Sequence, residues 1–283
     1  MASTAFTPHN AHFTIDESSQ ELGQENKHAQ DFNRFKLTQR DLGSMSVIGT
    51  LTKVEHGKWG PSNKPACLLC FRFQFQKGNA KLFRFEKAFI VIEFQARPPT
   101  HPKDDPAVLR YGPKRLQSVG TTATESWQYT IELSATVGIG PVQAGPTVEF
   151  GRQIIYDRHY AETIESDDWG NRRHSRPNCV RIWLREDEKQ KDGIPLELLA
   201  CVVVETTARS FQANVSVKVD SFFNLIAWPW SKDDPLLLEP GVNFGTPIRE
   251  KTGETDFSSL TADEWRQLVT PDLHFRHEIV NPS

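Results

Sequence analysis

The sequence predicts an all-β protein, an antiparallel β-sandwich or barrel-like body of about eight strands with one short C-terminal α-helix. Three observations support this class: long runs in which apolar and polar residues alternate, turn residues between those runs, and one capped helical segment. Alternation with a period of two places one set of side chains on each face of a strand. Several short runs of this kind are typical of a sandwich or a barrel.

The chain of 283 residues divides into three parts by composition. Residues 1–45 are polar and lack periodicity, so we expect a flexible N-terminal arm. Residues 46–245 carry the alternating runs and form the predicted β-sandwich body. Residues 246–283 form a tail that contains the helix. The 18 Phe and 7 Trp residues supply enough apolar surface for a substantial core.

The predicted strands cover residues 71–76, 83–94, 129–139, 148–150, 180–184, 196–204 and 211–219. The first two are separated by Gly78-Asn79 and are predicted to pair as a hairpin. Residues 96–126 contain five prolines and are predicted to be a loop, as are residues 157–178 and residues 56–61.

The helix is predicted from a capping box, in which the Thr261 hydroxyl and the Glu264 carboxylate bond each other's backbone amides. Leu260 and Trp265 stand at the positions of a hydrophobic staple. The helix is expected to end at residues 270–271, since a residue before proline disfavours the helical conformation. So short a helix needs docking against the body to persist, and we expect that the tail covers one of the body's surfaces.

Charge and hydropathy narrow the classes of partner. The net charge is −3 and no basic stripe is present, so nucleic-acid binding is not predicted. The N-terminus lacks the basic and apolar regions of a signal peptide. No apolar run reaches the roughly 20 residues that span a bilayer. We therefore expect a cytoplasmic protein without a transmembrane segment.

Cys67 and Cys70 form a C-x-x-C motif, which can bind zinc or carry redox chemistry. The motif starts an apolar strand, and residues three apart on a strand point to opposite faces. No second C-x-x-C or close His pair completes a tetrahedral site. We therefore interpret both residues as core residues with reduced thiols.

A set of segments between residues 180 and 240 resembles a known family. These segments are Val180–Glu186, Gly193–Pro195, Phe211–Val215 and Lys232–Pro235. Together they resemble a family of conserved but functionally uncharacterised β-rich proteins of filamentous fungi. The resemblance covers the last two thirds of the chain without its tail. It implies a fungal, intracellular origin and supplies no catalytic residue, cofactor or substrate.

Three pairs of adjacent carboxylates are candidate metal ligands: Asp104 and Asp105, Asp167 and Asp168, and Asp233 and Asp234. Calcium prefers oxygen ligands, and such pairs gathered at one end of a sandwich could hold it. Asp pairs also start turns, and none of these lies in an EF-hand-like loop.

An aromatic run next to the third pair is a candidate contact with a ligand or a membrane: Phe222, Phe223, Trp228 and Trp230. Trp is favoured at membrane interfaces, although the same residues could close the core. The alternation around Gly140 also fits a membrane-perturbing hairpin, but a half-exposed soluble hairpin has the same pattern.

Catalysis stays open. The chain contains no nucleophile elbow, phosphate loop, dinucleotide fingerprint or H-E-x-x-H motif. His159 could act as a general base near Glu162 and Glu165, but spacing alone does not place them in one pocket. A cyclase or isomerase that folds its substrate in an apolar pocket would leave no motif.

The composition and motifs favour a non-catalytic binding or interaction protein, whose sandwich presents a surface to a protein partner or a small molecule, without a cofactor. Two alternatives remain. One is a motif-poor cyclase, isomerase or accessory protein of fungal specialised metabolism. The other is a β-protein that docks onto or perturbs membranes.

Overall fold

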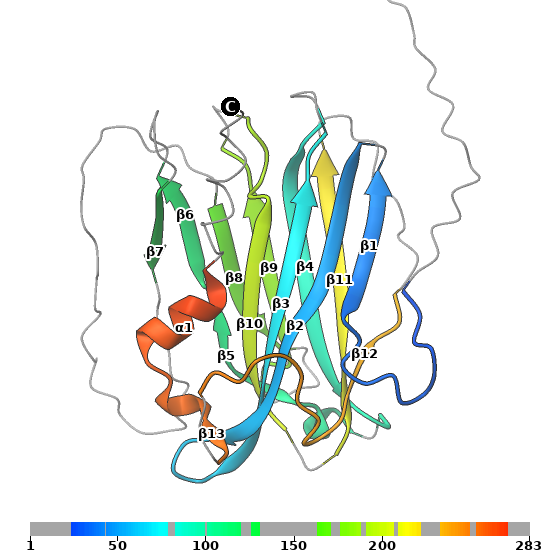
Figure 1. The fold of residues 1–283 in the computed structure, drawn as a ribbon, viewed down its shortest axis with the longest axis vertical. Helices are drawn as coiled ribbons and strands as arrows, with labels where there is room; N and C mark the ends of the chain where they lie inside the picture. The colour runs from blue at the N-terminus through cyan, green and yellow to red at the C-terminus, as the bar shows by residue number, and fades with distance from the viewer. Residues whose placement is uncertain are drawn as a thin grey trace, which may run out of the picture.

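The computed structural model describes residues 24–42, 44–78, 83–99, 101–119, 126–130, 163–170, 176–187, 191–206, 209–221, 233–249 and 253–270. These residues form two β-sheets that face each other, with a helix outside them (Figure 1). The predicted all-β sandwich with a short C-terminal helix is confirmed.

The elements in chain order are β1 (Lys36–Leu42), β2 (Met45–Trp59), β3 (Lys64–Gln76), β4 (Phe85–Ala96), η1 (Pro102–Asp104), β5 (Ala107–Gly112), β6 (Arg115–Val119), β7 (Ser126–Thr130), β8 (Thr163–Trp169), β9 (Cys179–Arg185), β10 (Glu197–Glu205), β11 (Phe211–Ser221), β12 (Leu236–Leu238), β13 (Thr255–Asp256), η2 (Phe257–Ser259) and α1 (Ala262–Val269).

One sheet has the strand order β1-β2-β3-β10-β5, and β13 pairs with β2 at its side. The other has the order β12-β11-β4-β9-β8-β6-β7. The described pairings between these strands are antiparallel except that of β13 with β2, which is parallel. An isolated bridge between Phe32 and Leu237 is also parallel. The strand orders show that more than half of the neighbouring strands in the two sheets are not consecutive in the sequence.

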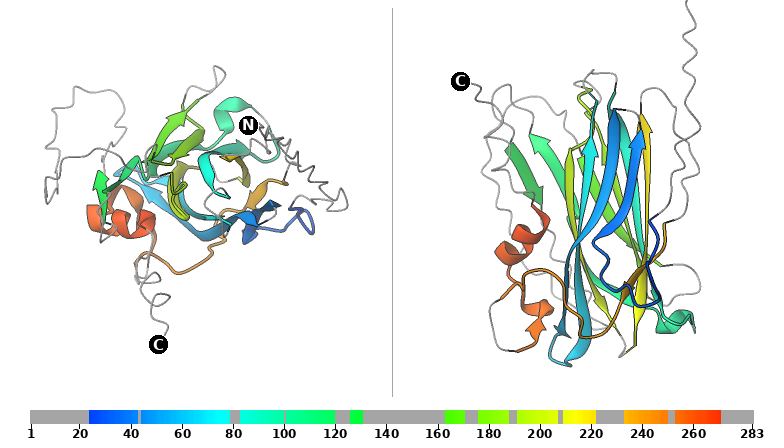
Figure 2. Two further views of the ribbon diagram at one scale, coloured as in Figure 1. Left: turned by 90° about the horizontal axis from the view of Figure 1, so that it is seen from above. Right: turned by 45° about the vertical axis from the view of Figure 1, so that its right-hand side comes forward.

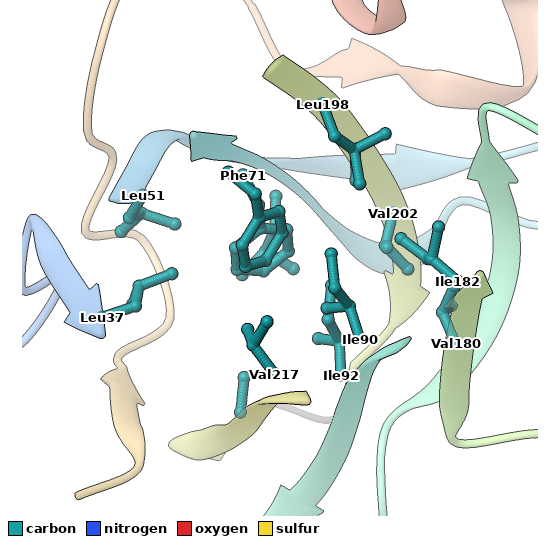
Figure 3. Close-up of a cluster of buried hydrophobic side chains, with 14 of the residues drawn as sticks. Leu37, Leu51, Phe71, Ile90, Ile92, Val180, Ile182, Leu198, Val202 and Val217 are labelled. Atoms are coloured by element: carbon teal, nitrogen blue, oxygen red, sulfur yellow. The ribbon is translucent and has the colours of Figure 1, made fainter. Parts of the chain in front are cut away.

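The main core lies between the two sheets and takes alternate residues from the strands of both (Figure 3). Phe71 and Leu198 point into it from one sheet, and Ile90, Ile182 and Val217 point into it from the other. Period-two alternation explains this arrangement, because every second side chain of a strand faces the same way.

The hairpin predicted for residues 71–76 and 83–94 is wrong. These residues belong to β3 and β4, which lie in different sheets and pair with other strands. Phe75 and Phe85 meet across the core instead, with ring centroids 6.1 Å apart in a T-shaped arrangement. Both strands bury an aromatic face in the same core, and alternation alone cannot distinguish this from direct pairing.

Several strands occur where the sequence predicts an arm or loops. β1 lies within the predicted arm and pairs with β2. β2 continues through residues 56–59, and β5, β6 and β8 occupy parts of the two predicted loops. The prolines of residues 96–126 lie outside β5 and β6. They therefore mark the ends of these short strands and do not exclude strands from the region.

The strands predicted after residue 180 agree with the structure. β9, β10 and β11 confirm the strands predicted at 180–184, 196–204 and 211–219. Most of the hairpin predicted around Gly140 lies outside the described residues, which include only β7 at its start. In the described part of the chain, no helix has the length and apolar character that crossing a membrane requires.

Candidate functional site

The outer surface of the β1-β2-β3-β10-β5 sheet carries a second apolar cluster, which we call the covered face. It consists of the strand residues Ala66, Leu68, Cys70, Leu109, Cys201 and Val203. Adjacent residues of β3 confirm the geometry: Cys67 points into the main core and Leu68 points outward. This sheet is therefore apolar on both sides, as is typical of a sheet that is covered on both faces.

The chain's own C-terminal residues cover this face. We call residues 253–270, which contain β13, η2 and α1, the C-terminal segment. Phe257, Leu260, Trp265 and Val269 are buried against the covered face. Figure 2 shows the segment lying outside the sandwich, on one side of it. The expectation that the tail covers a surface of the body is thus met.

Polar contacts with β2 and the residue after it hold the start of the segment and the chain just before it. Glu55 is buried, and its carboxylate accepts a hydrogen bond from the Thr255 hydroxyl (2.6 Å) and another from the backbone N–H of Ile248 (2.9 Å). Asp256 accepts from the backbone N–H of Gly60 (3.0 Å). A Cβ on Gly57 would lie only 2.3 Å from the carbonyl oxygen of Thr255, so β13 approaches β2 closely because Gly57 has no side chain.

The helix begins at the predicted capping box. The Thr261 hydroxyl accepts from the backbone N–H of Glu264, and the Glu264 carboxylate accepts from the backbone N–H of Thr261. Arg249 also donates two hydrogen bonds to this carboxylate, at 2.6 and 2.7 Å. The Arg249 guanidinium and the Thr261 amide lower the pKa of Glu264 to about 2.

Trp265 is the central anchor of the helix. Its indole lies over Gly112, where a Cβ would come within 2.8 Å of the indole Nε1. The guanidinium of Arg110 stacks on the ring, with its central carbon 4.2 Å from the ring centroid. The sequence placed Trp265 in a local staple with Leu260, whereas the structure also brings its ring against Arg110 and Gly112 of β5.

Arg110 is buried without an acidic partner among the described residues. Its Nη1 donates to the carbonyl oxygen of Leu260 at 3.4 Å, and its Nη2 has no hydrogen-bond partner there. Burial alone lowers the pKa of Arg110 to about 10. A buried guanidinium without a carboxylate is costly, because the desolvation of the charge is not offset by an ion pair. Within the described residues, the contacts of this guanidinium are therefore the Trp265 ring face and the Leu260 carbonyl oxygen.

Two thiols also meet on the covered face. Cys70 on β3 and Cys201 on β10 are directly paired in the sheet, and their sulfur atoms lie 2.6 Å apart. The Cys201 sulfur lies 3.3 Å from the carbonyl oxygen of Leu268 in α1. Both cysteines are free thiols and both are buried. The predicted divergence of the C-x-x-C motif is confirmed, since Cys67 belongs to the other cluster.

Cys67 and His56 form a thiol–imidazole pair on the core side of the same sheet, with Sγ 3.9 Å from Nε2. This is the residue combination of a nucleophile and its base. Burial, however, raises the pKa of the Cys67 thiol and lowers the pKa of His56. Both groups are thus kept neutral, which is the opposite of an activated thiolate–imidazolium pair.

The six candidate Asp ligands are engaged in separate contacts. Asp167 pairs with Arg181, and Asp168 accepts from the Tyr111 hydroxyl (3.3 Å). Of the other four, Asp104 ends η1, Asp105 follows it, and Asp233 and Asp234 precede β12. The Asp105 carboxylate accepts a hydrogen bond from the backbone N–H of Ala96, and the backbone N–H of Asp104 donates to the carbonyl oxygen of His101. The Asp233 carboxylate accepts from the Arg40 guanidinium and from the backbone N–H of Gln24. The Asp234 carboxylate accepts from the backbone N–H of Asn26. Within the described ranges, no three His, Cys, Asp or Glu residues are grouped so that they could hold a metal ion.

Several other candidate residues lie outside the described residues. These are the aromatic residues Phe222, Phe223, Trp228 and Trp230, together with His159 and Glu162. Glu165, the third residue of the proposed base site, is on β8, with its carboxylate 3.7 Å from the Arg115 guanidinium. The structure therefore tests neither the aromatic run nor the proposed base site.

The outer face of the other sheet carries a smaller aromatic feature. The Arg181 guanidinium lies 5.3 Å from the ring centroids of both Trp169 and Trp183. Its charge is compensated by Asp167, and Phe89 packs on Trp183 with centroids 5.2 Å apart. The two Trp rings thus contact Arg181 within the protein, one of them also contacts Phe89, and these contacts stabilise the outer surface of the sheet.

Sequence reasoning missed Arg110, Gly112 and the partnership of Cys70 with Cys201. The first two lie on β5, inside the predicted proline-rich loop, so no alternation pointed to them. The two cysteines are 131 residues apart, and only the pairing of β3 with β10 brings them together.

Similarity to known proteins does not assign a role to the covered face. No protein-family model matches the chain, and searches of curated proteins and of solved structures find no significant match.

Proposed function

We propose that this protein is a non-catalytic interaction module. The covered face binds a short amphipathic helical segment of a partner protein, in competition with the chain's own C-terminal segment. The observation that carries this proposal is Arg110, a buried guanidinium beneath α1 whose Nη2 has no hydrogen-bond partner in the described residues.

The apolar character of the face supports a helical occupant. Trp265 and Val269 are four residues apart on α1 and are both buried, which is the spacing of one helix face. Helix-in-groove recognition uses anchors with this spacing. Large aromatic anchors also contribute a disproportionate share of interface energy. A partner helix with similar anchors would fit the surface that α1 now occupies.

The weak intrinsic stability of α1 supports exchange with a partner. The helix has eight residues, and isolated helices shorter than about 12–15 residues are marginal in water. Its order therefore depends on docking. A partner therefore competes only with the buried contacts that α1 makes with the face, because the undocked helix has little stability of its own.

The chemistry of Arg110 indicates what such a partner would add. A carboxylate beside the guanidinium would form a charge-assisted hydrogen bond, which is about twice as strong as a neutral one. The C-terminal segment offers Arg110 the face of the Trp265 ring and one hydrogen-bond acceptor, the carbonyl oxygen of Leu260, but among its described residues no carboxylate. The preferred partner segment is thus amphipathic and carries an Asp or Glu next to its anchor residues.

The proposal is tested with the labelled synthetic peptide 253–270, added to the full chain in which Trp265→Ala weakens docking of the chain's own segment. We expect saturable binding to this variant and much weaker binding to the wild type, whose face is already occupied. Gln267→Ala is the matched control, because Gln267 lies on the exposed side of the same helix. It should behave like the wild type.

The preference for an acidic segment is tested by selecting helical peptides from a displayed library on the Trp265→Ala chain. Peptides with large apolar anchors and a nearby Asp or Glu should be enriched, and adding Arg110→Gln should remove the acidic preference. Equal binding of peptide 253–270 to the variant and the wild type, or to neither, would show that the face does not exchange its occupant.

One observation favours peripheral membrane contact as a second candidate function. Phe83 is 41% exposed and Leu196 is 38% exposed. Both lie at the end of the sandwich where Ser221 pairs with Phe85, and residues 222–232 follow Ser221 in the chain. Exposed apolar side chains at one end of a sandwich could enter the interfacial region of a bilayer.

Sedimentation with anionic vesicles, with and without calcium, tests this second function. Membrane contact through these residues predicts that the protein pellets with vesicles and that Phe83→Ser together with Leu196→Ser reduces pelleting. If the wild-type chain stays in the supernatant under both conditions, this candidate is excluded.

A further inference from the structure

We propose that Cys70 and Cys201 are a site of reversible oxidation, and that their disulfide releases helix α1 from the covered face. The oxidant is a hydroperoxide such as hydrogen peroxide. This inference does not require a partner protein, so it stands or falls separately from the proposed binding function.

The geometry of the sheet permits the bond. Cys201 on β10 is the direct partner of Cys70 on β3. Directly opposed residues of antiparallel strands have Cα atoms about 4.5 or 5.5 Å apart, and both values lie within the range that disulfides span. Both side chains are on the same face, and their sulfur atoms are 2.6 Å apart. The bond therefore requires little movement of the backbone.

The other two cysteines provide an internal comparison. Cys67 lies three residues from Cys70 but belongs to the core between the sheets. Cys179 is on β9 of the other sheet. Among the described residues, Cys70 and Cys201 are the two thiols with their sulfur atoms in contact.

The reaction proceeds in two displacements. The Cys70 thiolate attacks one oxygen of hydrogen peroxide, which gives a sulfenic acid and hydroxide. The Cys201 thiolate then attacks the Cys70 sulfur and displaces the second hydroxide as the S–S bond forms. The two thiol protons convert the two hydroxides to water. Two thiols and one peroxide thus give one disulfide and two waters, and two electrons pass from sulfur to oxygen.

Access to the thiols depends on the C-terminal segment. Cys201 is fully buried and Cys70 is 4% exposed. Burial and the neighbouring Cys70 raise the pKa of Cys201, so the docked state keeps its thiol protonated and unreactive. Transient lifting of α1 admits water and the oxidant. The segment thus controls how fast the pair is oxidised.

Oxidation in turn weakens the docking of α1. The Cys201 thiol carries one hydrogen, and two acceptors lie within its reach: the Cys70 sulfur and the carbonyl oxygen of Leu268. Leu268 has one of the last four carbonyls of the helix, which lack intrahelical partners. A disulfide sulfur carries no hydrogen, so this carbonyl loses its donor. An unsatisfied group of this kind favours the undocked state, in which water satisfies it.

The test uses the full-length chain. It is treated with hydrogen peroxide, its remaining thiols are alkylated, and unreduced peptides are mapped by mass spectrometry. Amide hydrogen exchange of residues 262–269 is measured on the same sample. We expect a Cys70–Cys201 cross-link and exchange in α1 that is roughly fivefold to a hundredfold faster. Reduction with dithiothreitol should restore both to their starting values.

Two substitutions at one position separate the chemistry from the packing. Cys201→Ser keeps a donor for Leu268 but cannot be oxidised, so α1 should stay protected with or without peroxide. Cys201→Ala removes the donor, so α1 should exchange fast even without peroxide. Cys67→Ala is the control for a buried cysteine of the same strand and should form the cross-link as the wild type does.

Two results would overturn the proposal. One is the absence of a Cys70–Cys201 cross-link in peroxide-treated protein whose other residues are measurably oxidised. The other is a complete cross-link that leaves the exchange of α1 unchanged. Cys70→Ala serves if Cys201 variants do not fold, since it removes the cross-link and leaves the contact between Cys201 and Leu268 in place.

Discussion

Two buried guanidinium groups, those of Arg40 and Arg110, are compensated in different ways. The Arg40 side chain is 1% exposed and lies 2.9 Å from the Asp233 carboxylate, which is 8% exposed. Arg110 has an aromatic ring and one distant carbonyl. The first arrangement fixes the N-terminal strand to the residues before β12. In the second, a cation–π contact and one hydrogen bond to a backbone carbonyl stand in place of an ion pair.

At the residue scale, Asp233→Ala should lower the free energy of unfolding by about 3–5 kcal/mol, because it leaves the Arg40 charge buried without its partner. Asp234→Ala is the matched control. Asp234 is exposed, so its loss should cost less than about 1 kcal/mol. Urea denaturation measures both values. If Asp233 instead serves a calcium site, calcium should raise the stability of the wild type and not that of Asp233→Ala.

Glu264 gives a pH-dependent prediction. Its pKa is lowered from an ordinary value of 4.5 to about 2. The stabilisation by ionised Glu264 is therefore fully present above about pH 4.5 and is lost as the pH falls toward 2. Glu264→Gln should have a lower Tm than the wild type at pH 7, and the difference should shrink between these two pH values. A difference in Tm that is constant with pH would contradict this assignment.

At the scale of elements, the C-terminal segment has boundaries that its sequence predicts and a position that it does not. The capping box from Thr261 to Glu264 is a local pattern, and it forms as predicted. The site on β5 under Trp265 depends on Gly112, which is 153 positions earlier in the printed sequence. A staple motif cannot indicate so distant a contact.

Gly112→Ala tests how closely helix and sheet fit. The added Cβ would lie 2.8 Å from the Trp265 Nε1, so docking of α1 should weaken by about 1–3 kcal/mol. Trp265→Ala should cost more, about 3–5 kcal/mol, because a large side chain is lost from a buried site. Hydrogen exchange of residues 262–269 reports on both. In the Trp265→Ala background, Gly112→Ala should add almost nothing, and additive effects would contradict direct contact.

At the scale of the whole molecule, two apolar clusters share one sheet. The main core lies between the sheets, and the smaller cluster lies between that sheet and the C-terminal segment. β3 contributes alternate residues to both, so this strand is buried on both sides. The outer cluster is completed late in the chain, by residues that follow the last strand of the sandwich.

Deleting residues 246–283 should leave the sandwich folded and expose the covered face. Among the described residues, no buried member of the main core comes from positions after 245, so the far-UV circular dichroism of the sheets should persist. Binding of the dye ANS and self-association should both increase, because an apolar face becomes accessible. A truncated chain that unfolds, or one with unchanged dye binding and stability, would show that the segment is not a separable cover.

Local sequence patterns were enough to predict which residues share one face of a strand and where the helix begins. Both depend on neighbours within a few positions: alternation for β9, β10 and β11, and the capping box for α1. It also predicted that Cys67 and Cys70 diverge, since the direction of a side chain on a strand is a local property. Short strands next to prolines were not predicted, because five or six residues are too few to show a period of two.

Which strands are neighbours and which surface the helix covers depend on contacts between distant parts of the chain, and no local pattern predicts them. An alternating strand has the same pattern whether it pairs with the next strand or faces it across a core, as β3 and β4 show. The candidate site is formed by pairings between strands that are far apart in the sequence. β10 between β3 and β5 brings Cys201 to Cys70 and places Arg110 and Gly112 beside them, where α1 docks. The physical reason is that register and layer are set by packing of the whole chain.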